Sequence, residues 1–313
     1  MRGGRIVRTL FKNILQIARR ALGTSYIIKE ERHQRSQEHK LLISLGNAVQ
    51  CSTTNPTTLR ASTTFKRCAE IVSLLSPLDV KDKSYVRVGK DYDGGYVMLD
   101  DFGSGKIEAA YSFGIGADAS WDEDMANRGF EVFMYDHTID RLPAQHSRFH
   151  FKKIGVTGHK KEGDLRALPE LISENGHAAC SNLIMKMDVE GHEWEVFAET
   201  PSGVLNQFCQ FVVEFHNLTN AAYDPNCRFM IEVLNKINAT HQCVHLHANG
   251  GGVPLWIGGL VIPALLEVTY IRRRDVEGAL IPNERQFPTA IDHPTFKGWP
   301  DIYLGRFTSS VET

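Results

Sequence analysis

The chain has 313 residues, of which 42% are hydrophobic and 23% are charged, a composition typical of an ordinary globular protein with a sizeable core. It carries 35 lysine and arginine residues against 37 aspartate and glutamate residues, and the net charge of −2 excludes a general attraction to nucleic acid. The six cysteines form no CxxC pair and no regular framework, so we expect reduced thiols and a cytoplasmic location.

Residues 1–28 form a predicted basic amphipathic helix. All of its charged residues are arginine or lysine, and they alternate with apolar residues. The apolar stretches are too short and too often interrupted by charge to span a membrane. Three interpretations remain open: peripheral contact of this helix with a membrane surface, an organelle-targeting peptide, or a helix docked on its own domain.

Residues 29–64 are predicted to be a mostly flexible linker, because they are polar and rich in Ser and Thr around one short apolar patch. The main domain is expected over residues 65–313. It opens with a predicted helix at 65–75. Short strands at 85–88 and 96–99 follow, around an Asp-Gly-Gly turn, and this pattern predicts a hairpin.

Residues 107–136 have the pattern of a strand, a glycine turn, a helix and a second strand. Gly114 and Gly116 follow an apolar run, so backbone without Cβ atoms lies where a buried strand emerges and a ligand can approach closely. Asp136 closes the second strand roughly twenty residues later, the separation at which a carboxylate accepts hydrogen bonds from ribose hydroxyls. The unit predicts a nucleoside cofactor lying across the glycine turn.

The charge of the predicted helix separates two cofactors. Asp118, Asp122, Glu123 and Asp124 crowd its first turns, where they would repel the pyrophosphate of a dinucleotide but tolerate a cationic sulfonium and an ammonium group. This pattern favours S-adenosylmethionine over NAD. The alternative is that these acids only cap the helix and complement its dipole.

Two segments, SFGIGADASWDEDMANRGFEVFMYDHT at 112–138 and MKMDVEGHEWEVF at 185–197, resemble the FkbM-type methyltransferases. The similarity covers roughly residues 85–274, and the DVEG segment is its most specific part. The resemblance implies S-adenosylmethionine as cofactor and O-methylation as the reaction. The chain departs from many methyltransferases in having Tyr-Ser-Phe before the glycines, where an acid is common, and Asp118 where a third glycine is common.

The rest of the domain alternates strands with helices, which predicts an α/β fold with a mostly parallel sheet. The last strand follows its predecessor through three glycines without an intervening helix, so it is predicted to be antiparallel, as in the class I methyltransferase variant of the Rossmann-like sheet. The predicted strands are 149–156, 183–189, 211–215, 244–247 and 260–271, and the predicted helices are 165–172, 194–205 and 229–237.

Ligands of an open α/β sheet bind beyond the C-terminal ends of its strands, so residues that follow strands are the site candidates. Gly155 and Val156 end one strand and are expected to border the adenine. Asp188 and Glu190 follow an apolar strand, and His216 follows the next. These three are the predicted catalytic residues, Asp188 also contacting the cofactor, and either Asp188 or His216 would remove the hydroxyl proton.

A metal site is a further interpretation of the same strand ends. His216, His247, Asp188 and Glu190 could converge on a divalent cation. No compact ligand motif is present, and histidines at strand ends more often form structural or substrate-positioning hydrogen bonds. We therefore expect no metal.

The predicted function is methyl transfer from S-adenosylmethionine to a hydroxyl of a small molecule or glycan, by direct displacement at the sulfonium carbon. Two alternatives from other classes remain open. One is an NAD-type oxidoreductase, and the other is a catalytically silent adaptor that uses the domain only for binding.

Overall fold

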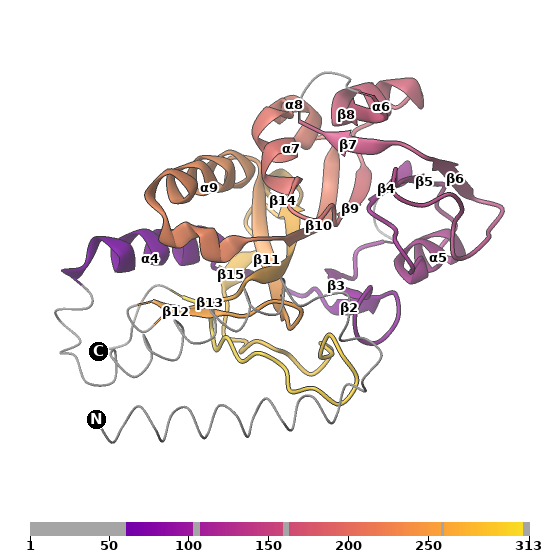
Figure 1. The fold of residues 1–313 in the computed structure, drawn as a ribbon. Coiled ribbons are helices and arrows are strands. Elements are labelled where there is room, and N and C mark those ends of the chain that lie inside the picture. The colour runs from indigo at the N-terminus through magenta and orange to yellow at the C-terminus, as the bar shows by residue number, and fades with distance from the viewer. Residues whose placement is uncertain (1–60, 103–106, 159–162, 258–259, 309–313) are drawn as a thin grey trace, which may run out of the picture.

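The computed structural model describes four stretches of the chain, residues 61–102, 107–158, 163–257 and 260–308 (Figure 1). The predicted basic helix at 1–28 and nearly all of the predicted linker lie outside the described residues. The first described helix, α4, begins at Thr63 and therefore slightly before the expected start of the domain.

A seven-stranded sheet forms the centre of the molecule, with the strand order β11-β14-β10-β9-β4-β5-β6 (Figure 1). Strands β10, β9, β4, β5 and β6 pair in parallel, whereas β14 is antiparallel to both of its neighbours. The predicted mostly parallel sheet with one antiparallel strand is thus confirmed. The strands are β4 (Ala109–Phe113), β5 (Val132–Tyr135), β6 (Phe149–Lys152), β9 (Leu183–Met187), β10 (Phe208–Phe215), β11 (His241–Asn249) and β14 (Leu265–Arg272).

The two faces of the sheet are covered differently because successive side chains of a strand point to opposite faces. Large side chains such as Tyr111, Met185 and Phe211 are buried on one face, under a layer of helices (Figure 1). These helices are α4 (Thr63–Leu75), α6 (Leu168–Glu174), α7 (Glu193–Glu199), α8 (Ser202–Leu205) and α9 (Asp224–Asn238). The smaller Ala110 and Ile184 lie on the other face. That face is covered by α5 (Ser120–Asn127) and by the hairpin of β2 (Tyr85–Val88) and β3 (Tyr96–Leu99).

A row of polar side chains crosses the face that the hairpin covers. Glu214 of β10 is paired with Glu267 of β14, and Glu267 is paired in turn with His247 of β11. Lys186 of β9 is paired with Val212, two residues before Glu214, so it points to the same face. The charged members of this row are buried. Buried charges need partners or ligands, and this face therefore holds the candidate site.

Proline breaks three of the predicted elements. The expected helix at 165–172 begins as a strand, β8 (Leu165–Ala167), and becomes α6 only with Pro169 in its first turn. Pro201 separates α7 from α8 within the expected helix at 194–205. Pro263 divides the expected strand at 260–271 into β13 (Leu260–Ile262) and β14, because proline lacks the N–H that a sheet ladder needs.

The expected strand at 149–156 is also divided. After β6 the chain leaves the central sheet, and β7 (Gly155–Thr157) pairs in parallel with β8 instead. Two further short pairs lie at the edges of the domain, one of β1 (Leu78–Val80) with β15 (Leu280–Pro282), the other of β12 (Leu255–Ile257) with β13. Two 3-10 helices complete the described part, η2 (Leu218–Ala222) and η3 (Arg273–Asp275).

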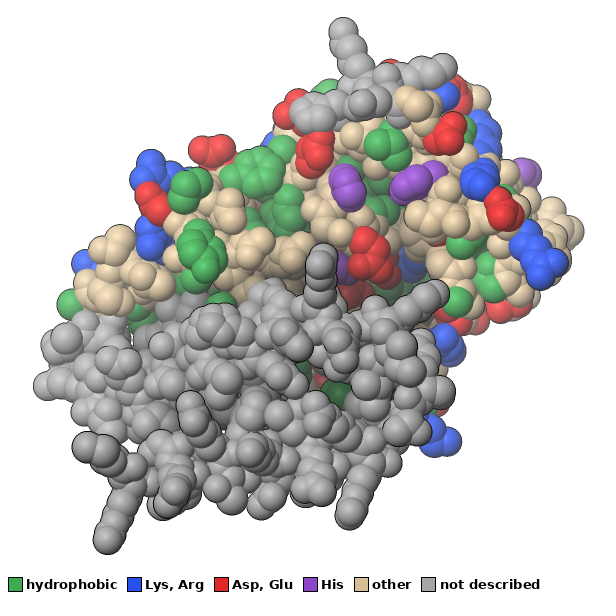
Figure 2. All heavy atoms as spheres, viewed as in Figure 1, with side chains coloured by type: hydrophobic (Ala, Val, Ile, Leu, Met, Phe, Trp, Pro, Cys, Tyr) green, Lys and Arg blue, Asp and Glu red, His purple; other side chains and the backbone are tan. Residues whose placement is uncertain are grey.

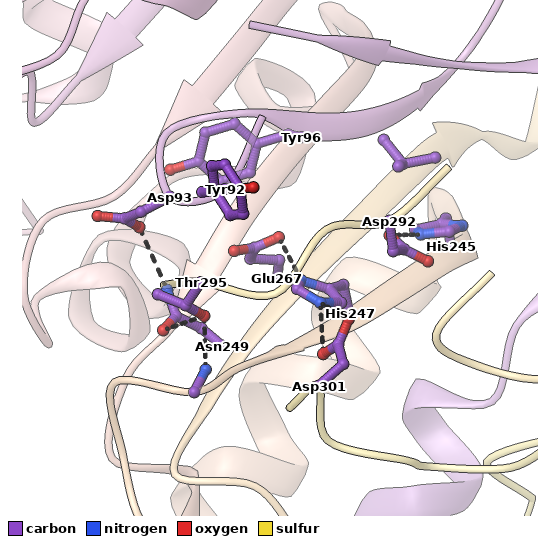
Figure 3. A network of polar contacts seen from close by, with 12 residues as sticks. Tyr92, Asp93, Tyr96, His245, His247, Asn249, Glu267, Asp292, Thr295 and Asp301 are labelled. Atoms are coloured by element: carbon purple, nitrogen blue, oxygen red, sulfur yellow. Dashed lines mark hydrogen bonds and ion pairs between the residues drawn. The ribbon is translucent and has the colours of Figure 1, made fainter. Parts of the chain in front are cut away.

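The segment that follows β15 runs back across the polar face, where two histidines of β11 hold it (Figure 3). Nε2 of His245 lies 2.9 Å from Oδ1 of Asp292, and Nε2 of His247 lies 3.0 Å from Oδ1 of Asp301. The C-terminal segment, which had no assignment from the sequence, therefore forms part of the cover over the polar face.

None of the described helices combines the length and the apolarity needed to cross a membrane. The five cysteines in the described part of the chain are free thiols.

Candidate functional site

Three cavities meet beyond the C-terminal ends of β4, β9 and β10, and Asp188 and Glu190 line all three. Figure 2 shows acidic and histidine side chains gathered in this region, near the middle of the visible face. The apolar cavity, of about 310 Å³, is walled by Tyr135, Val156 and Leu165. The lysine cavity, of about 320 Å³, contains Lys90 and Lys186. The acidic cavity, of about 440 Å³, contains Asp93, Glu214 and His216.

The residues predicted from the sequence all line this group of cavities. Asp188 and Glu190 stand at the junction, as expected for residues at the end of a central strand. Of the others, Gly155 and Val156 line the apolar cavity, Gly116 and Asp118 the lysine cavity, Gly114 and Asp136 both of these, and His216 the acidic cavity.

Asp136 organises the glycine turn. Its Oδ2 accepts hydrogen bonds from the backbone N–H groups of Ile115 and Gly116, both at 2.9 Å, and its Oδ1 accepts from the backbone N–H and the hydroxyl of Thr138. Burial alone would raise the pKa of Asp136, but these hydrogen bonds outweigh burial and lower it. Four donors occupy the roughly four acceptor positions of a carboxylate, so a ribose hydroxyl would share or displace one of them.

Gly114 allows β4 and the end of β9 to approach each other. A Cβ atom on Gly114 would lie 1.6 Å from the carbonyl oxygen of Asp188, far inside any permitted contact, and its φ of +76° also favours glycine. Gly116 differs, because a Cβ atom there would meet nothing within 4 Å, although its φ is +57°. Gly114 is therefore required by packing and Gly116 by backbone conformation alone.

The acidic start of α5 proves less crowded toward the cavities than its sequence suggests. Asp122 is buried beneath the helix, where burial raises its pKa to about 6 against the opposing charge of Lys186. Asp124 accepts a hydrogen bond from the backbone N–H of Gly89 in the hairpin. Of the four acids, Asp118 alone lines one of the three cavities. It accepts a hydrogen bond from the backbone N–H of Ser120, the first residue of α5, and is paired with Lys90 at 2.6 Å.

Lys186 brings a buried ammonium group to the lysine cavity. It is 4% exposed, and its Nζ donates a hydrogen bond to the carbonyl oxygen of Gly114 at 2.5 Å. An ammonium carries three N–H donors, so two remain available to a ligand or to water. Sequence reasoning did not assign this lysine a ligand contact, although a lysine within the apolar strand 183–187 is an unusual signal.

The end of β9 is held from two directions. Tyr96 of the hairpin donates a hydrogen bond from its hydroxyl to Oδ2 of Asp188 at 3.0 Å. On the other side, Oε1 of Glu193 accepts from the backbone N–H groups of Val189 and Gly191. Between them Glu190 has a φ of +57°, a left-handed conformation that few residues other than glycine adopt, and its side chain is exposed at the cavity junction.

His216 is surrounded by carboxylates. Its Nδ1 lies 2.9 Å from Oε1 of Glu193, while its Nε2 faces oxygens of Glu190 at 3.5 Å, Glu214 at 3.7 Å and Asp188 at 3.8 Å. Burial would lower the pKa of His216, but the hydrogen bond to Glu193 and the surrounding negative charges outweigh burial and raise it to about 9. The imidazole is therefore protonated at neutral pH unless another cation takes the place of the proton.

Glu214 is the most unusual acid of the site. It is 4% exposed, lines the acidic cavity, and accepts no hydrogen bond from any residue that the structure describes. Burial, together with the negative charges of Asp188 and Glu267, raises the pKa of Glu214 well above its ordinary value. Such a carboxyl group is poised to bind a cation or to hold a proton.

His247 takes no part in this cluster, so the four-residue convergence considered from the sequence does not form. Its Nδ1 lies 3.1 Å from Glu267, and its Nε2 is bonded to Asp301 (Figure 3). The charge of Glu267 and the hydrogen bonds to both acids outweigh burial and raise the pKa of His247 to about 10. The reason for the separation is topological: β14 lies between β10 and β11, so His247 is two strands away from Glu214.

The outer wall of the acidic cavity comes from segments far apart in the sequence. Thr295 accepts a hydrogen bond from the backbone N–H of Gly250 at 2.7 Å and donates one to Asn249 at 3.0 Å, and its carbonyl accepts from the backbone N–H of Asp93 (Figure 3). Asn249 in turn donates to the Asp93 carboxylate. Sequence reasoning placed only a turn at Asp93 and nothing at Thr295, because no local pattern links them.

Comparison with protein-family models and with curated protein sequences finds no match to this chain. The α/β fold with its mostly parallel seven-stranded sheet is compatible with a Rossmann-like fold.

Proposed function

We propose that the protein is an S-adenosylmethionine-dependent methyltransferase that acts on a hydroxyl group of a polar acceptor. The observation that carries this proposal is the joining of three cavities of different chemistry at Asp188 and Glu190. An apolar cavity suits a nucleoside, a cavity of mixed charge suits an amino acid, and an acidic cavity suits a hydroxyl-bearing substrate.

The lysine cavity fits the methionine part of this cofactor. The amino acid end carries both a carboxylate and an ammonium group. Lys186 and Lys90 can bind the carboxylate, and Asp118 can bind the ammonium. Lys186 already has its ammonium group fixed by Gly114, so its remaining donors need little further ordering.

The same cavity is unfavourable for a dinucleotide. Its lining contains five carboxylates, namely Asp93, Asp118, Asp136, Asp188 and Glu190, against two lysines. A pyrophosphate would bring further negative charge to this lining, whereas a sulfonium brings positive charge to the junction. The carboxylates that line the lysine cavity thus support the distinction between cofactors better than Asp122, Glu123 and Asp124, which are absent from its lining.

Sheet topology also favours a methyltransferase over a dinucleotide-binding enzyme. Dinucleotide-binding sheets have six parallel strands in the order 3-2-1-4-5-6. Here the corresponding strands are β6, β5, β4, β9, β10 and β11, with the antiparallel β14 inserted between the last two. An antiparallel strand near the end of the sheet is what the resemblance to FkbM-type methyltransferases implies.

The chain's own residues would bind the acceptor and receive its proton. When bound, S-adenosylmethionine supplies an electrophilic methyl group. Asp188 lies at the junction, with Oδ2 held by Tyr96 and Oδ1 facing His216, so it can accept the proton of the acceptor hydroxyl. His216 is the weaker candidate for the base, because its raised pKa leaves it protonated at neutral pH. Asn217, Asn249 and Thr295 offer amide and hydroxyl groups for a polyhydroxylated acceptor.

The test is isothermal titration calorimetry with S-adenosylhomocysteine and with NADH, followed by incubation with isotopically labelled S-adenosylmethionine and a metabolite extract. We expect binding of S-adenosylhomocysteine alone and transfer of the label to a hydroxyl-bearing metabolite. Binding of NADH alone would support the oxidoreductase alternative. Cofactor binding without label transfer to any acceptor would support the adaptor alternative.

A further inference from the structure

The cluster around His216 has the composition and geometry of a divalent-cation site. Ligand atoms of Asp188, Glu193 and His216 all lie within 4.8 Å of one another. Around Nε2 of His216, oxygens of Asp188, Glu190 and Glu214 stand at 3.5 to 3.8 Å, too far for good hydrogen bonds. Neighbouring ligands on one cation, each about 2.1 Å from it, are separated by about 3.0–3.4 Å. To reach this spacing, the oxygens of Asp188, Glu190 and Glu214 would each move toward Nε2 by a few tenths of an ångström.

Two further observations favour a cation at this point. Glu214 is 4% exposed, faces the acidic cavity and has no hydrogen-bond donor among the described residues. Oε2 of Glu193 is buried and equally without a partner in the described part of the chain. A buried carboxylate is costly unless a charge or a donor compensates it. The structure therefore places two buried carboxyl groups, Glu193 and Glu214, and the half-buried Asp188 around one imidazole.

We propose that Nε2 of His216, together with the carboxylates of Asp188 and Glu214, binds one divalent cation, with Glu190 completing the site from the surface. Binding displaces any proton from Nε2 and leaves Nδ1–H to donate to Oε1 of Glu193. Glu193 is then a positioning residue that fixes the orientation and the tautomer of the imidazole, an arrangement that metal-ligating histidines commonly share. A set of one imidazole and several carboxylates suits Mn²⁺, which accepts both nitrogen and oxygen.

The position of this cation would explain the polarity of the acidic cavity. All four residues line that cavity, so the cation would face the acceptor and not the core. A bound cation lowers the pKa of a coordinated hydroxyl, and Oδ2 of Asp188, the oxygen that would not coordinate the cation, could take up the proton. That role depends on the proposed methyl transfer, whereas cation binding itself does not.

The test is titration of the metal-free full-length protein with MnCl₂, following the electron paramagnetic resonance signal of free Mn²⁺. We expect one bound Mn²⁺ per chain. His216→Gln and Glu214→Gln should each weaken binding at least tenfold, because each removes a ligand. Glu193→Gln should weaken it by about 10–100-fold, the range for residues that orient a metal-binding histidine, while retaining an oxygen for the backbone N–H groups.

His247→Gln is the matched control, since His247 is also buried between carboxylates on the same face of the sheet but lies outside the cluster. Its Mn²⁺ affinity should stay within twofold of the parent. Glu190→Gln changes an exposed side chain and should weaken Mn²⁺ binding several-fold. It keeps the test decisive if a substitution of one of the buried ligands prevents folding. Absence of saturable Mn²⁺ binding, or unchanged affinity in both Glu190→Gln and Glu193→Gln, overturns the assignment.

The same preparation separates this inference from the proposed function. Stoichiometric Mn²⁺ binding without binding of S-adenosylhomocysteine would leave the cation site standing and contradict the methyltransferase. Methyl transfer by a protein that shows no saturable Mn²⁺ binding would support the methyltransferase and contradict the cation site.

Discussion

The hydroxyl of Tyr96 donates a hydrogen bond to Oδ2 of Asp188 across 92 residues of sequence. Tyr96 belongs to the hairpin that covers the sheet, whereas Asp188 ends a central strand. This one contact fixes the carboxylate on which all three cavities converge. The hairpin therefore covers the site and also contributes the side chain of Tyr96 to it.

Replacing Tyr96 by Phe should destabilise the protein and reduce activity. The substitution removes a buried donor from an ionised acceptor, and hydrogen bonds of this kind contribute about 1.5–3 kcal/mol. Urea unfolding should show a loss of that size, and the proposed methyl transfer should slow with it. Tyr223→Phe, in an exposed tyrosine, should change neither quantity. Equal stability of Tyr96→Phe and the parent would mean that the hydroxyl is not bonded to Asp188.

Alanine at the two glycines of the turn should have very different effects. Gly114→Ala places a Cβ atom 1.6 Å from the carbonyl oxygen of Asp188, so β4 and β9 must separate. Gly116→Ala has open space and only its backbone conformation to oppose it, at a cost of about 1–2 kcal/mol. We expect Gly114→Ala to lower the melting temperature much more than Gly116→Ala. A similar loss in the two variants would contradict the close packing of Gly114.

Replacing Asp136 by Asn should weaken binding of the proposed cofactor by loosening the glycine turn. The amide retains one carbonyl oxygen but presents an NH₂ group either to the N–H groups of the turn or to the N–H and hydroxyl groups of Thr138. We expect calorimetric affinity for S-adenosylhomocysteine to fall by about 1.5–3 kcal/mol, the range for hydrogen bonds to a charged group. Thr138→Val, which removes a single donor, should cost less. Unchanged affinity in a folded Asp136→Asn protein would show that the turn does not shape the cofactor site.

The buried His241 should make stability depend on pH. Burial and the nearby positive charges of Arg272, Arg273 and Arg274 lower its pKa to about 4, although a hydrogen bond to the carbonyl of Phe208 opposes the shift. The folded state thus binds a proton less readily than the unfolded state. The stability that His241 contributes is complete above pH 6.5 and is lost as the pH falls toward 4.

This dependence can be isolated by comparing the parent with His241→Gln in urea unfolding between pH 7 and pH 4. Other titrating groups cancel in the difference. The parent should lose up to about 3 kcal/mol relative to the variant over this range. A difference that does not change with pH would show that His241 is protonated equally in both states.

Local sequence patterns predicted those site residues that directly follow a single strand. Gly114, Asp136 and Asp188 each follow an apolar run, and the rule that ligands bind beyond such runs places them together without knowledge of distant contacts. The hairpin turn at residues 91–95 was predictable in the same way. What its sequence did not reveal was that Asp93 and Tyr96 reach the junction, because this depends on how the hairpin is packed over the sheet.

Long-range pairing explains what sequence reasoning missed. One interpretation of the sequence brought His247 close to His216, because the two lie at the ends of consecutive predicted strands. The insertion of β14 between β10 and β11 moves His247 away and pairs it with Glu267. Glu193 pairs with His216 in the same way. An acid at the start of α7 can be recognised in the sequence, but its partner follows the neighbouring strand β10. No periodicity in the chain reports such a pairing.

The position of Thr295 has a consequence for the order of events during synthesis. The strands of the central sheet end at Arg272, whereas Thr295 closes the outer wall of the acidic cavity only after a further stretch of chain. A nascent polypeptide can therefore assemble its sheet while the cavity still lacks this wall. Residue 295 must leave the exit tunnel of the ribosome before this wall can form, so we expect the sheet to assemble before the site closes.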